Sequence, residues 1–382
     1  MTTGPAGPVY TGAMTDRTIH PDTLHRWVAD LFLAAGSSPT EAALTADHLV
    51  LSNLSGHDSH GVGMVPRYVK AIAADELVLN RTVEVVTDTG GLMLIDAHRG
   101  IGQSVTHQAM AIAIKRAKET GVCVMGLRNS HHLGRVGHWA EQAIAEGLIS
   151  VHFTNAVSQH WVAPYGGAEA RFVTNPFTVG IPRPDGDGGP IVLDFATSAI
   201  AQGKVRVAYN AGKQTPAGAL MDHEGKPTTN PGVLFEPVDG RLGALTTMAA
   251  HKGYALAMVC ELLGAALTGG AVTIPANQPK AGVWNNMLTI VFDPARFGTQ
   301  SSFEVATRDF VDWVKSARLA DGFDEIMMPG DPERKSRKAR AAALPIDEGT
   351  IAEMDAAAAT VANSAAGKGK GPGPLSALMG AR

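Results

Sequence analysis

Cysteine is scarce in this chain of 382 residues, which contains only Cys123 and Cys260. Each lies in an apolar run and the two are far apart in the sequence, so we expect buried free thiols and no disulfide framework. This pattern favours a protein of the reducing cytoplasm over a secreted one.

The chain also lacks a large excess of positive or negative charge, and it has no long apolar run. The formal net charge of -4 gives no electrostatic reason to expect nucleic acid or an anionic membrane as a partner. The longest apolar stretch, 254–267, is interrupted by Glu261 and is shorter than the roughly 18 residues that a membrane helix needs. The first residues, MTTGPAGPVYTGAM, lack the charged and apolar blocks of a signal peptide, so we expect 1–17 to form a disordered leader.

The usual motifs of nucleotide-binding and hydrolytic enzymes are absent as well. The nearest approach to a Rossmann fingerprint is GIGQSV at 100–105, which lacks the third glycine and the acidic residue expected about 20 positions later. A tight turn between a strand and a helix explains it better. The chain also has no P-loop, no GxSxG elbow and no HExxH motif. Any cofactor is therefore bound outside a standard Rossmann site.

The pattern that is present predicts an α/β protein. Apolar periodicity indicates helices at 21–36, 38–56, 66–73, 107–120, 138–146 and 253–266, and strands at 92–96, 122–127, 149–155, 177–181, 191–195 and 287–292. SPTE at 38–41 has the capping-box pattern of a helix start. The order of elements from 90 to 160 predicts a parallel or mixed sheet. The tail at 364–382 is low in complexity and is expected to be disordered.

Histidines gather in two glycine-bearing segments. GHDSHG at 56–61 contains His57 and His60, and NSHHLGRVGH at 129–138 contains His131, His132 and His138. The imidazole group exchanges protons near neutral pH because its ordinary pKa is about 6.5. The neighbouring glycines leave room for a ligand to approach the backbone. The two segments are therefore candidate parts of one site.

Three chemistries fit these residue types. A metal site is suggested by the HxxH spacing of His57 and His60, although this lies on a turn. A hydrolase would use Ser59 as a nucleophile activated by a base. The third option is proton transfer at His60, coupled to hydride transfer between a 2-hydroxy acid and a nicotinamide. Residue types alone do not separate the three.

Six motifs in a fixed order resemble the type-2 malate/L-lactate dehydrogenase family: DSHGVGMVPRYV, RNSHHLG, VTNPF, VLDFATS, GKPTTNP and HKGYALAM. The resemblance covers about 21–354. It implies an oxidoreductase that interconverts 2-hydroxy and 2-oxo acids with NAD, NADP being the other candidate, and that forms a homodimer. It also implies a non-Rossmann α/β fold with a mixed sheet and flanking helices, which explains the missing fingerprint.

The resemblance also implies a domain plan. The catalytic unit covers 18–363 and has two subdomains, one made of the N-terminal and C-terminal helices and one a central cofactor-binding part at about 90–290. The alternative from another class is a metal-dependent hydrolase built on His57, His60 and His132.

The resemblance assigns roles to the histidine segments. It places His60 against the nicotinamide and the reacting carbon, with Ser59 orienting its ring. His132 is the alternative proton acceptor. His131 falls on a variable position and is interpreted as structural, and His57 is interpreted as a polar residue at a helix end.

Cofactor contacts carried over from the family lie in five places: Gly134, Arg135 and Val136; Val192, Leu193, Asp194, Phe195 and Ala196; His251; Asn285; and Gly330, Asp331, Pro332 and Glu333.

The chain departs from the family at Met64, where many members have an arginine suited to a substrate carboxylate. Arg67 and Arg99 are then the candidate substrate contacts. An apolar Met64 favours larger or aromatic substrate side chains over malate.

Overall fold

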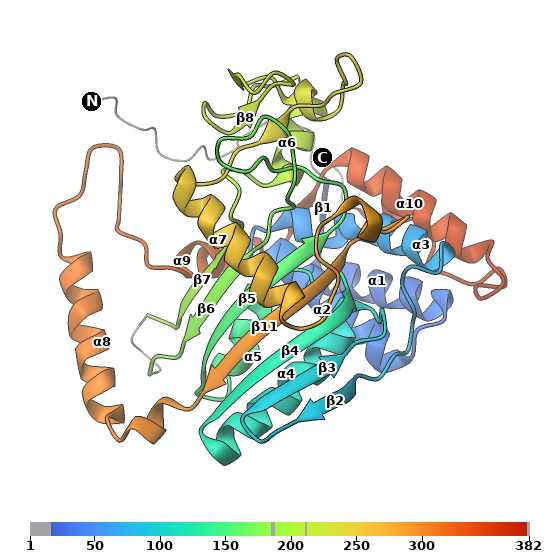
Figure 1. The fold of residues 1–382 in the computed structure, drawn as a ribbon. Coiled ribbons are helices and arrows are strands. Elements are labelled where there is room, and N and C mark those ends of the chain that lie inside the picture. Colours follow the sequence, from blue (N-terminus) through green and yellow to red (C-terminus); the bar gives the residue numbers. More distant parts are fainter. Residues whose placement is uncertain (1–16, 185–187, 211, 380–382) are drawn as a thin grey trace.

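A seven-stranded mixed sheet forms the centre of the computed structural model, which describes residues 17–184, 188–210 and 212–379 (Figure 1). Its strand order is β2-β3-β4-β11-β5-β6-β7. Within the described chain, β3 and β4 are the one parallel pair of this sheet, and the other neighbours are antiparallel. The strands are β2 (Glu84–Asp88), β3 (Leu92–Asp96), β4 (Val122–His131), β5 (Ile149–Val157), β6 (Phe177–Ile181), β7 (Ile191–Phe195) and β11 (Trp284–Phe292). The predicted mixed sheet is confirmed.

Helices cover both faces of this sheet (Figure 1). Met125 and Leu127 of β4 pack with the apolar side chains of α4 (Gly102–Thr120). A side chain at Gly126, which points the other way, would meet Thr268 after the π-helical turn Leu262–Ala266. That turn continues α7 (His251–Glu261), while α5 (Gly137–Ile144) lies on the α4 side.

Two element boundaries differ from the predicted ones for a shared reason. α4 begins at Gly102, whereas the prediction placed its start at 107. The first turns of α4 bury the polar residues Gln103, Ser104 and Thr106. β4 continues to His131, so part of the predicted loop is strand. Buried polar side chains at both places hide the apolar periodicity on which the prediction rests.

The chain ends meet in a second, helical layer. It consists of α1 (Pro21–Ala35), α2 (Pro39–Leu54), α3 (Val65–Ala73) and α10 (Glu348–Ala362). β1 (Arg17–Ile19) pairs with β12 (Leu344–Ile346) and joins the two ends. The predicted cap is present, since Ser38 accepts a hydrogen bond from the backbone N–H of Glu41.

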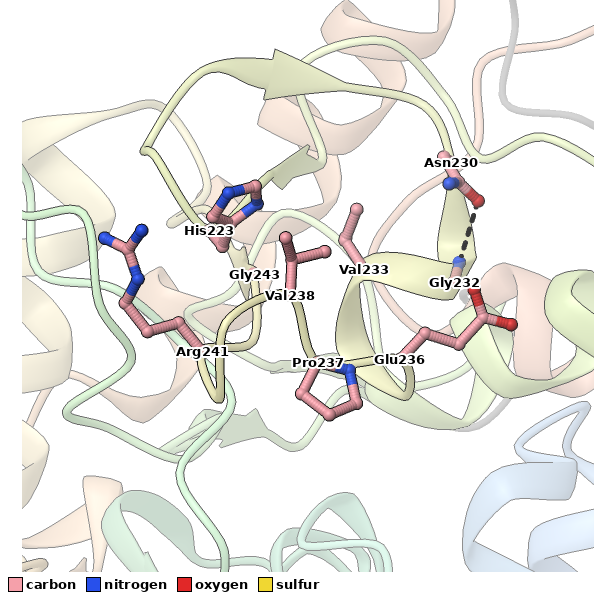
Figure 2. A pocket seen from close by; sticks show the side chains of 9 residues that line it. All are labelled: His223, Asn230, Gly232, Val233, Glu236, Pro237, Val238, Arg241 and Gly243. Carbon is pink, nitrogen blue, oxygen red and sulfur yellow. Dashed lines mark hydrogen bonds between the residues drawn. The ribbon is translucent and has the colours of Figure 1, made fainter.

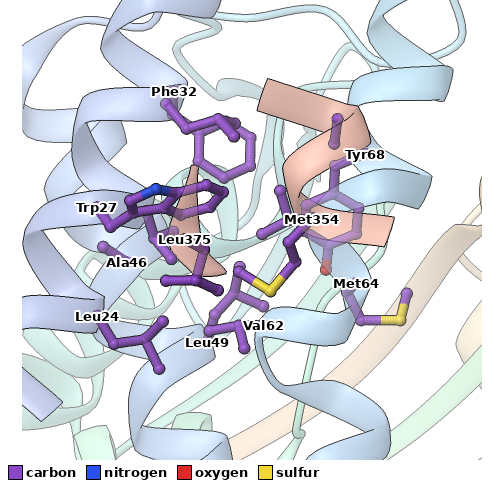
Figure 3. Packing of buried hydrophobic residues seen from close by; sticks show 14 of the residues in the cluster. Leu24, Trp27, Phe32, Ala46, Leu49, Val62, Met64, Tyr68, Met354 and Leu375 are labelled. Carbon is purple, nitrogen blue, oxygen red and sulfur yellow. The ribbon is translucent and has the colours of Figure 1, made fainter. Parts of the chain in front are cut away.

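Residues 364–379 of the tail pack on this helical layer, where the sequence predicts disorder, and 380–382 lie outside the described residues. Leu375 is fully buried among apolar side chains of the layer (Figure 3). Trp27 donates from Nε1 to the carbonyl of Gly373 at 2.8 Å, and Arg17 donates to Ser376 and Met379 carbonyls. The low-complexity composition of the tail did not predict that Leu375 would be buried or that backbone carbonyls of the tail would accept hydrogen bonds from Trp27 and Arg17. Residues 1–16 of the expected leader lie outside the described residues, and Arg17 begins β1.

Shortening Leu375 to alanine is expected to lower the free energy of unfolding by about 2–5 kcal/mol, the usual range for a fully buried leucine. Urea unfolding at neutral pH measures this. Leu378→Ala is the matched control, because Leu378 is 49% exposed and should change stability by less than about 0.5 kcal/mol. Equal stability of both variants would show that the tail does not dock in solution.

A small third layer stands over the end of the main sheet (Figure 1). It contains α6 (Gln202–Asn210) and the short strands β8 (Leu220–Met221), β9 (Pro227–Thr228) and β10 (Ala244–Leu245). Its own apolar cluster includes Val205 of α6 and Leu220 of β8.

An arm projects from the body at the left of the view (Figure 1). Its helix α8 (Gln300–Lys315) buries one residue, Val311, and the chain then returns to α9 (Asp331–Arg340). No helix in the described ranges is long and apolar enough to cross a membrane.

Candidate active site

The two histidine segments meet at the end of β4. The rings of His60 and His132 are stacked, with centroids 5.6 Å apart and an interplanar angle of 27°. His60 ends a short 3-10 turn, Asp58–His60, that follows α2. Asn53 shapes this turn by accepting the N–H of Val62 at 2.8 Å, and a side chain at Gly61 would collide with the Asn53 amide.

Two buried side chains, Tyr68 and Gln103, hold the His132 ring in place through a chain of hydrogen bonds. The phenol of Tyr68 lies 2.7 Å from His132 Nδ1, and Gln103 Nε2 lies 2.9 Å from the phenol oxygen. Gln103 also donates to the His132 carbonyl at 3.4 Å, which accepts only, so the amide nitrogen faces both groups. The phenol, already accepting from Gln103, then donates to Nδ1. The proton of neutral His132 therefore sits on Nε2.

His60 has no such fixed tautomer. Its Nδ1 lies 2.9 Å from the hydroxyl of Ser59, which is exposed and either donates or accepts. His60 Nε2 is thus free to act as a base when Nδ1 carries the proton. The pair combines one ring that presents a proton with one ring that takes up a proton.

Both rings are neutral at pH 7. Burial, and next the charge of His57, lower the pKa of His60 to about 4. Burial and the charge of His60 lower the pKa of His132 well below its ordinary value. Burial raises the pKa of Tyr68, so the phenol keeps its proton. Neutral imidazoles suit a general base and a hydrogen-bond donor to a carbonyl.

The other histidines of the two segments have different roles. His131 is fully buried with its ring edge-on to Tyr68, which fits the structural role expected for it. His57 binds Glu333 at 2.9 Å. Among the described residues, no group of three His, Cys, Asp or Glu side chains is arranged to hold a metal ion. The hydrolase alternative therefore has no ligand cluster to support it.

The loop after His132 surrounds a buried arginine. His48 Nε2 accepts the N–H of Arg135 at 2.9 Å, and a side chain at Gly134, whose φ is +74°, would lie 2.1 Å from that nitrogen. The Arg135 side chain is 2% exposed and pairs with Glu141. Its Nε and Nη1 have no hydrogen-bond partner within the described part of the chain. Two orphaned buried donors indicate a place for an anion.

Segments predicted for the cofactor converge around Arg135. Asp194 of β7 accepts from the N–H of Gly137 and from the hydroxyl of Thr178, each at 2.8 Å. A side chain at Gly137 would fill the space between Arg135 and Asp194. The turn at 330–333 is adjacent, because Val192 donates to Pro329 at 3.1 Å. The structure thus brings 134–136, 192–196 and 330–333 together.

Two further predicted cofactor residues lie differently. His251 is exposed at the start of α7 and packs edge-on against Tyr165. Asn285 is 4% exposed, and its amide is used internally, accepting from Leu133 N–H at 2.9 Å and donating to Asn155 at 2.8 Å. Asn285 therefore braces the loop that carries His132.

The two arginines predicted for the substrate are separated. Arg67 precedes Tyr68 on α3, and its charge contributes to the lowered pKa of His132. Arg99 lines a different cavity of about 490 Å³ with Asp96 and Trp284, and neither His60 nor His132 lines it. Another cavity of about 320 Å³, in the small layer, is lined by residues such as His223 and Arg241 (Figure 2). It contains none of the predicted site residues.

Sequence reasoning missed several residues of this site. Tyr68 was within reach, since it lies in the same motif as His60, DSHGVGMVPRYV. His48 had a weaker signal, as a polar residue in an otherwise apolar helix. Glu141 and Arg337, which joins Arg135 at the same carboxylate, had no signal at all.

The structure is an α/β protein in which two stacked neutral histidines lie next to a loop that carries a buried arginine with unpaired donors. A sequence model described as malate/L-lactate dehydrogenase matches residues 19–355. The chain belongs to this family of oxidoreductases, which includes hydroxycarboxylate dehydrogenases.

Three relatives illustrate the similarity. Hydroxycarboxylate dehydrogenase B of Escherichia coli (strain K12) is 44% identical over 332 residues, covering 86% of this chain and 90% of the relative. L-lactate dehydrogenase of Cupriavidus necator is 38% identical, covering 82% and 90%. A solved structure of a putative malate/lactate dehydrogenase from E. coli has a TM-score of 0.86 at 41% identity, covering 91% and 96%.

Proposed function

We propose that this chain is an NAD(P)-dependent 2-hydroxycarboxylate dehydrogenase that reduces 2-oxo acids when NADH is in excess. The observation that carries the proposal is the stacked pair His60 and His132, one ring free to accept a proton and the other fixed to donate one. The names of the relatives, hydroxycarboxylate and L-lactate dehydrogenases, support the substrate class.

The residues around Arg135 fit a dinucleotide cofactor, with NAD proposed first and NADP as the alternative. The orphaned Nε and Nη1 of Arg135 would hold a phosphate oxygen, and Gly134 and Gly137 keep the backbone open there. Asp194 would accept from ribose hydroxyls or the carboxamide. When bound, the nicotinamide gives or takes the hydride.

The chain itself moves the proton. In oxidation, His60 Nε2 takes the proton of the substrate hydroxyl. In reduction, the proton returns from protonated His60 Nε2 to the substrate oxygen, while His132 Nε2–H, whose tautomer Tyr68 fixes, donates a hydrogen bond to that oxygen. Ser59 sets the angle of the His60 ring through its hydrogen bond.

A panel of 2-oxo acids assayed with NADH and with NADPH tests the proposal. Oxidation of either reduced cofactor by at least one 2-oxo acid is expected, with aromatic or larger side chains preferred because Met64 is apolar. Metal analysis accompanies the assay. Stoichiometric zinc with no cofactor oxidation by any 2-oxo acid would favour the hydrolase alternative.

We further propose a homodimer in which α8 of one copy packs on a second copy. This helix exposes Phe310 at 64% and Trp313 at 75%, and Phe297 before it is 73% exposed. Large aromatic side chains on a projecting helix mark an interaction surface. After α8 and a long connecting segment, the chain leads back to the turn at 330–333, which supports a link between the arm and the site.

Changing Trp313 to aspartate is expected to convert the dimer to a monomer, because a charge would enter the centre of an apolar interface. Light scattering at micromolar concentration measures the mass, for which the monomer value is 39.8 kDa. Leu92→Asp is the control, since Leu92 is 58% exposed but lies on the β2–β3 edge of the sheet. A wild-type mass near that of the monomer would contradict the proposal.

A further inference from the structure

Helix α6 of the small layer faces the loop that carries His60. Val205 anchors the helix in the apolar cluster of the small layer. Gly203 lies against the catalytic loop, because a Cβ built on it would be 2.9 Å from the Cβ of Ser59. Arg206 is one helical turn further on and shares the face of Gly203, since residues i and i+3 lie one above the other. Arg206 therefore lies on the face of α6 that meets the turn carrying Ser59 and His60.

Arg206 and Arg67 are cationic side chains that have no anionic partner among the residues that the structure describes. Within the described chain neither side chain has a hydrogen bond or an ion pair. They come from different layers, α6 and α3, and Arg67 is adjacent to the tyrosine that holds His132. Two guanidinium groups near enough for one charge to act on the other, and neither paired with a carboxylate of the described residues, leave an unfilled place for a ligand anion.

The electrostatics agree with this geometry. Although Arg67 is exposed on one side, the surrounding protein and then the charge of Arg206 lower its pKa. A lowered arginine pKa means that the positive charge is disfavoured where it stands, and a bound anion would relieve this.

We propose that Arg206 and Arg67 together bind the carboxylate of the 2-oxo or 2-hydroxy acid. A planar guanidinium matches a carboxylate with two parallel hydrogen bonds, and two of them at different angles fix its orientation. The carbon next to that carboxylate is the reacting carbon, so the clamp presents it to His60 and His132. Met64 offers no charge and is 9% exposed at the edge of the helical core (Figure 3). This assignment rests on the proposed dehydrogenase function.

Arg206→Gln tests the clamp through KM and kcat. With phenylpyruvate and NADH, KM is expected to rise roughly 10- to 100-fold, the size expected for loss of a charge-assisted pair. The NADH dissociation constant should stay within about threefold, because the Arg135 loop is intact. Arg206→Lys keeps the charge without the fork and should give an intermediate KM.

Lys204→Gln is the matched control, since it removes the same charge from the same helix at a position one residue from Gly203 and two from Arg206. It should leave KM within about twofold. The discriminating readout is the preference for phenylpyruvate over its neutral primary amide, which should collapse in Arg206→Gln and persist in Lys204→Gln. An unchanged preference in Arg206→Gln overturns the clamp.

A binding measurement separates failure of the clamp from failure of the proposed function. Oxamate carries the carboxylate and the neighbouring carbonyl but is not reduced, so calorimetry with oxamate and NADH needs no turnover. Tight binding by the wild type that weakens at least tenfold in Arg206→Gln supports the clamp even if no 2-oxo acid is reduced. Equal binding by both proteins, or binding by neither, contradicts it.

Discussion

Replacing His60 with asparagine is expected to lower kcat for oxidation of a 2-hydroxy acid by about 10²-fold or more. Asparagine keeps a similar size and one hydrogen bond but does not take up the hydroxyl proton. NADH affinity should change much less, because the proposed phosphate and ribose contacts are made by other residues, Arg135 and Asp194. The pKa of His60 is lowered to about 4, so the base stays active well below pH 6.5. The acid limb of kcat/KM for oxidation is therefore expected nearer pH 4 than pH 6.5.

His132→Asn is the necessary comparison, since the same family resemblance allows that ring to be the base. Its fixed Nε2–H predicts the larger loss in the reduction direction, and Tyr68→Phe should reproduce part of that loss by releasing the tautomer. A His60→Asn enzyme that turns over within about threefold of wild type, beside an inactive His132→Asn enzyme, would reverse the two roles. His60 would then be a residue that packs against the nicotinamide.

Local patterns explain which parts of the fold were predictable. The first helix was predicted at 21–36, and α1 covers Pro21–Ala35 with Gly36 as a left-handed cap. The strands at 177–181 and 191–195 match β6 and β7. In each case the signal lies within the segment itself: a period of 3.6 or 2, a cap, or a glycine stop. The turn interpretation of 100–105 is of the same kind and is confirmed, with Gly102 packed against the His132 carbonyl.

Long-range partners explain what was not predictable. Tyr68 meets His132 across 64 residues, and His48 meets Arg135 across 87. No local spacing encodes such pairs. Asn285 was assigned to the cofactor from a motif position, and that motif did not predict the hydrogen bonds of its amide to Leu133 and Asn155. Arg206 had no motif at all, because its role arises only where two layers face each other.

Acid is expected to destabilise this protein progressively as the pH falls below about 6.5, because several imidazoles are buried in the neutral form. Burial is the main cause of the lowered pKa in each of them, which are His48, His60, His131, His132, His138 and His152. The folded state therefore binds fewer protons than the unfolded chain, whose histidines titrate near pH 6.5. Stability is fully present above that pH and is lost as the pH falls toward the folded values, about 3 for His131 and about 4 for His152. Each pKa unit corresponds to about 1.4 kcal/mol, so a few such groups match a typical domain's whole stability of about 5–15 kcal/mol.

His131→Leu isolates one contributor to this acid sensitivity. His131 is fully buried, and neither ring nitrogen has a hydrogen-bond partner among the described residues, so leucine removes two unsatisfied polar atoms. The variant is expected to unfold at a lower pH than wild type and to gain up to about 1 kcal/mol at pH 7. Circular dichroism across a pH 3–8 titration, with urea unfolding at pH 7 and pH 5, measures both effects. His223→Leu, in the turn between β8 and β9, is the control and should leave the acid midpoint in place. If the midpoints of wild type and His131→Leu coincide, the buried histidine at 131 does not drive acid unfolding.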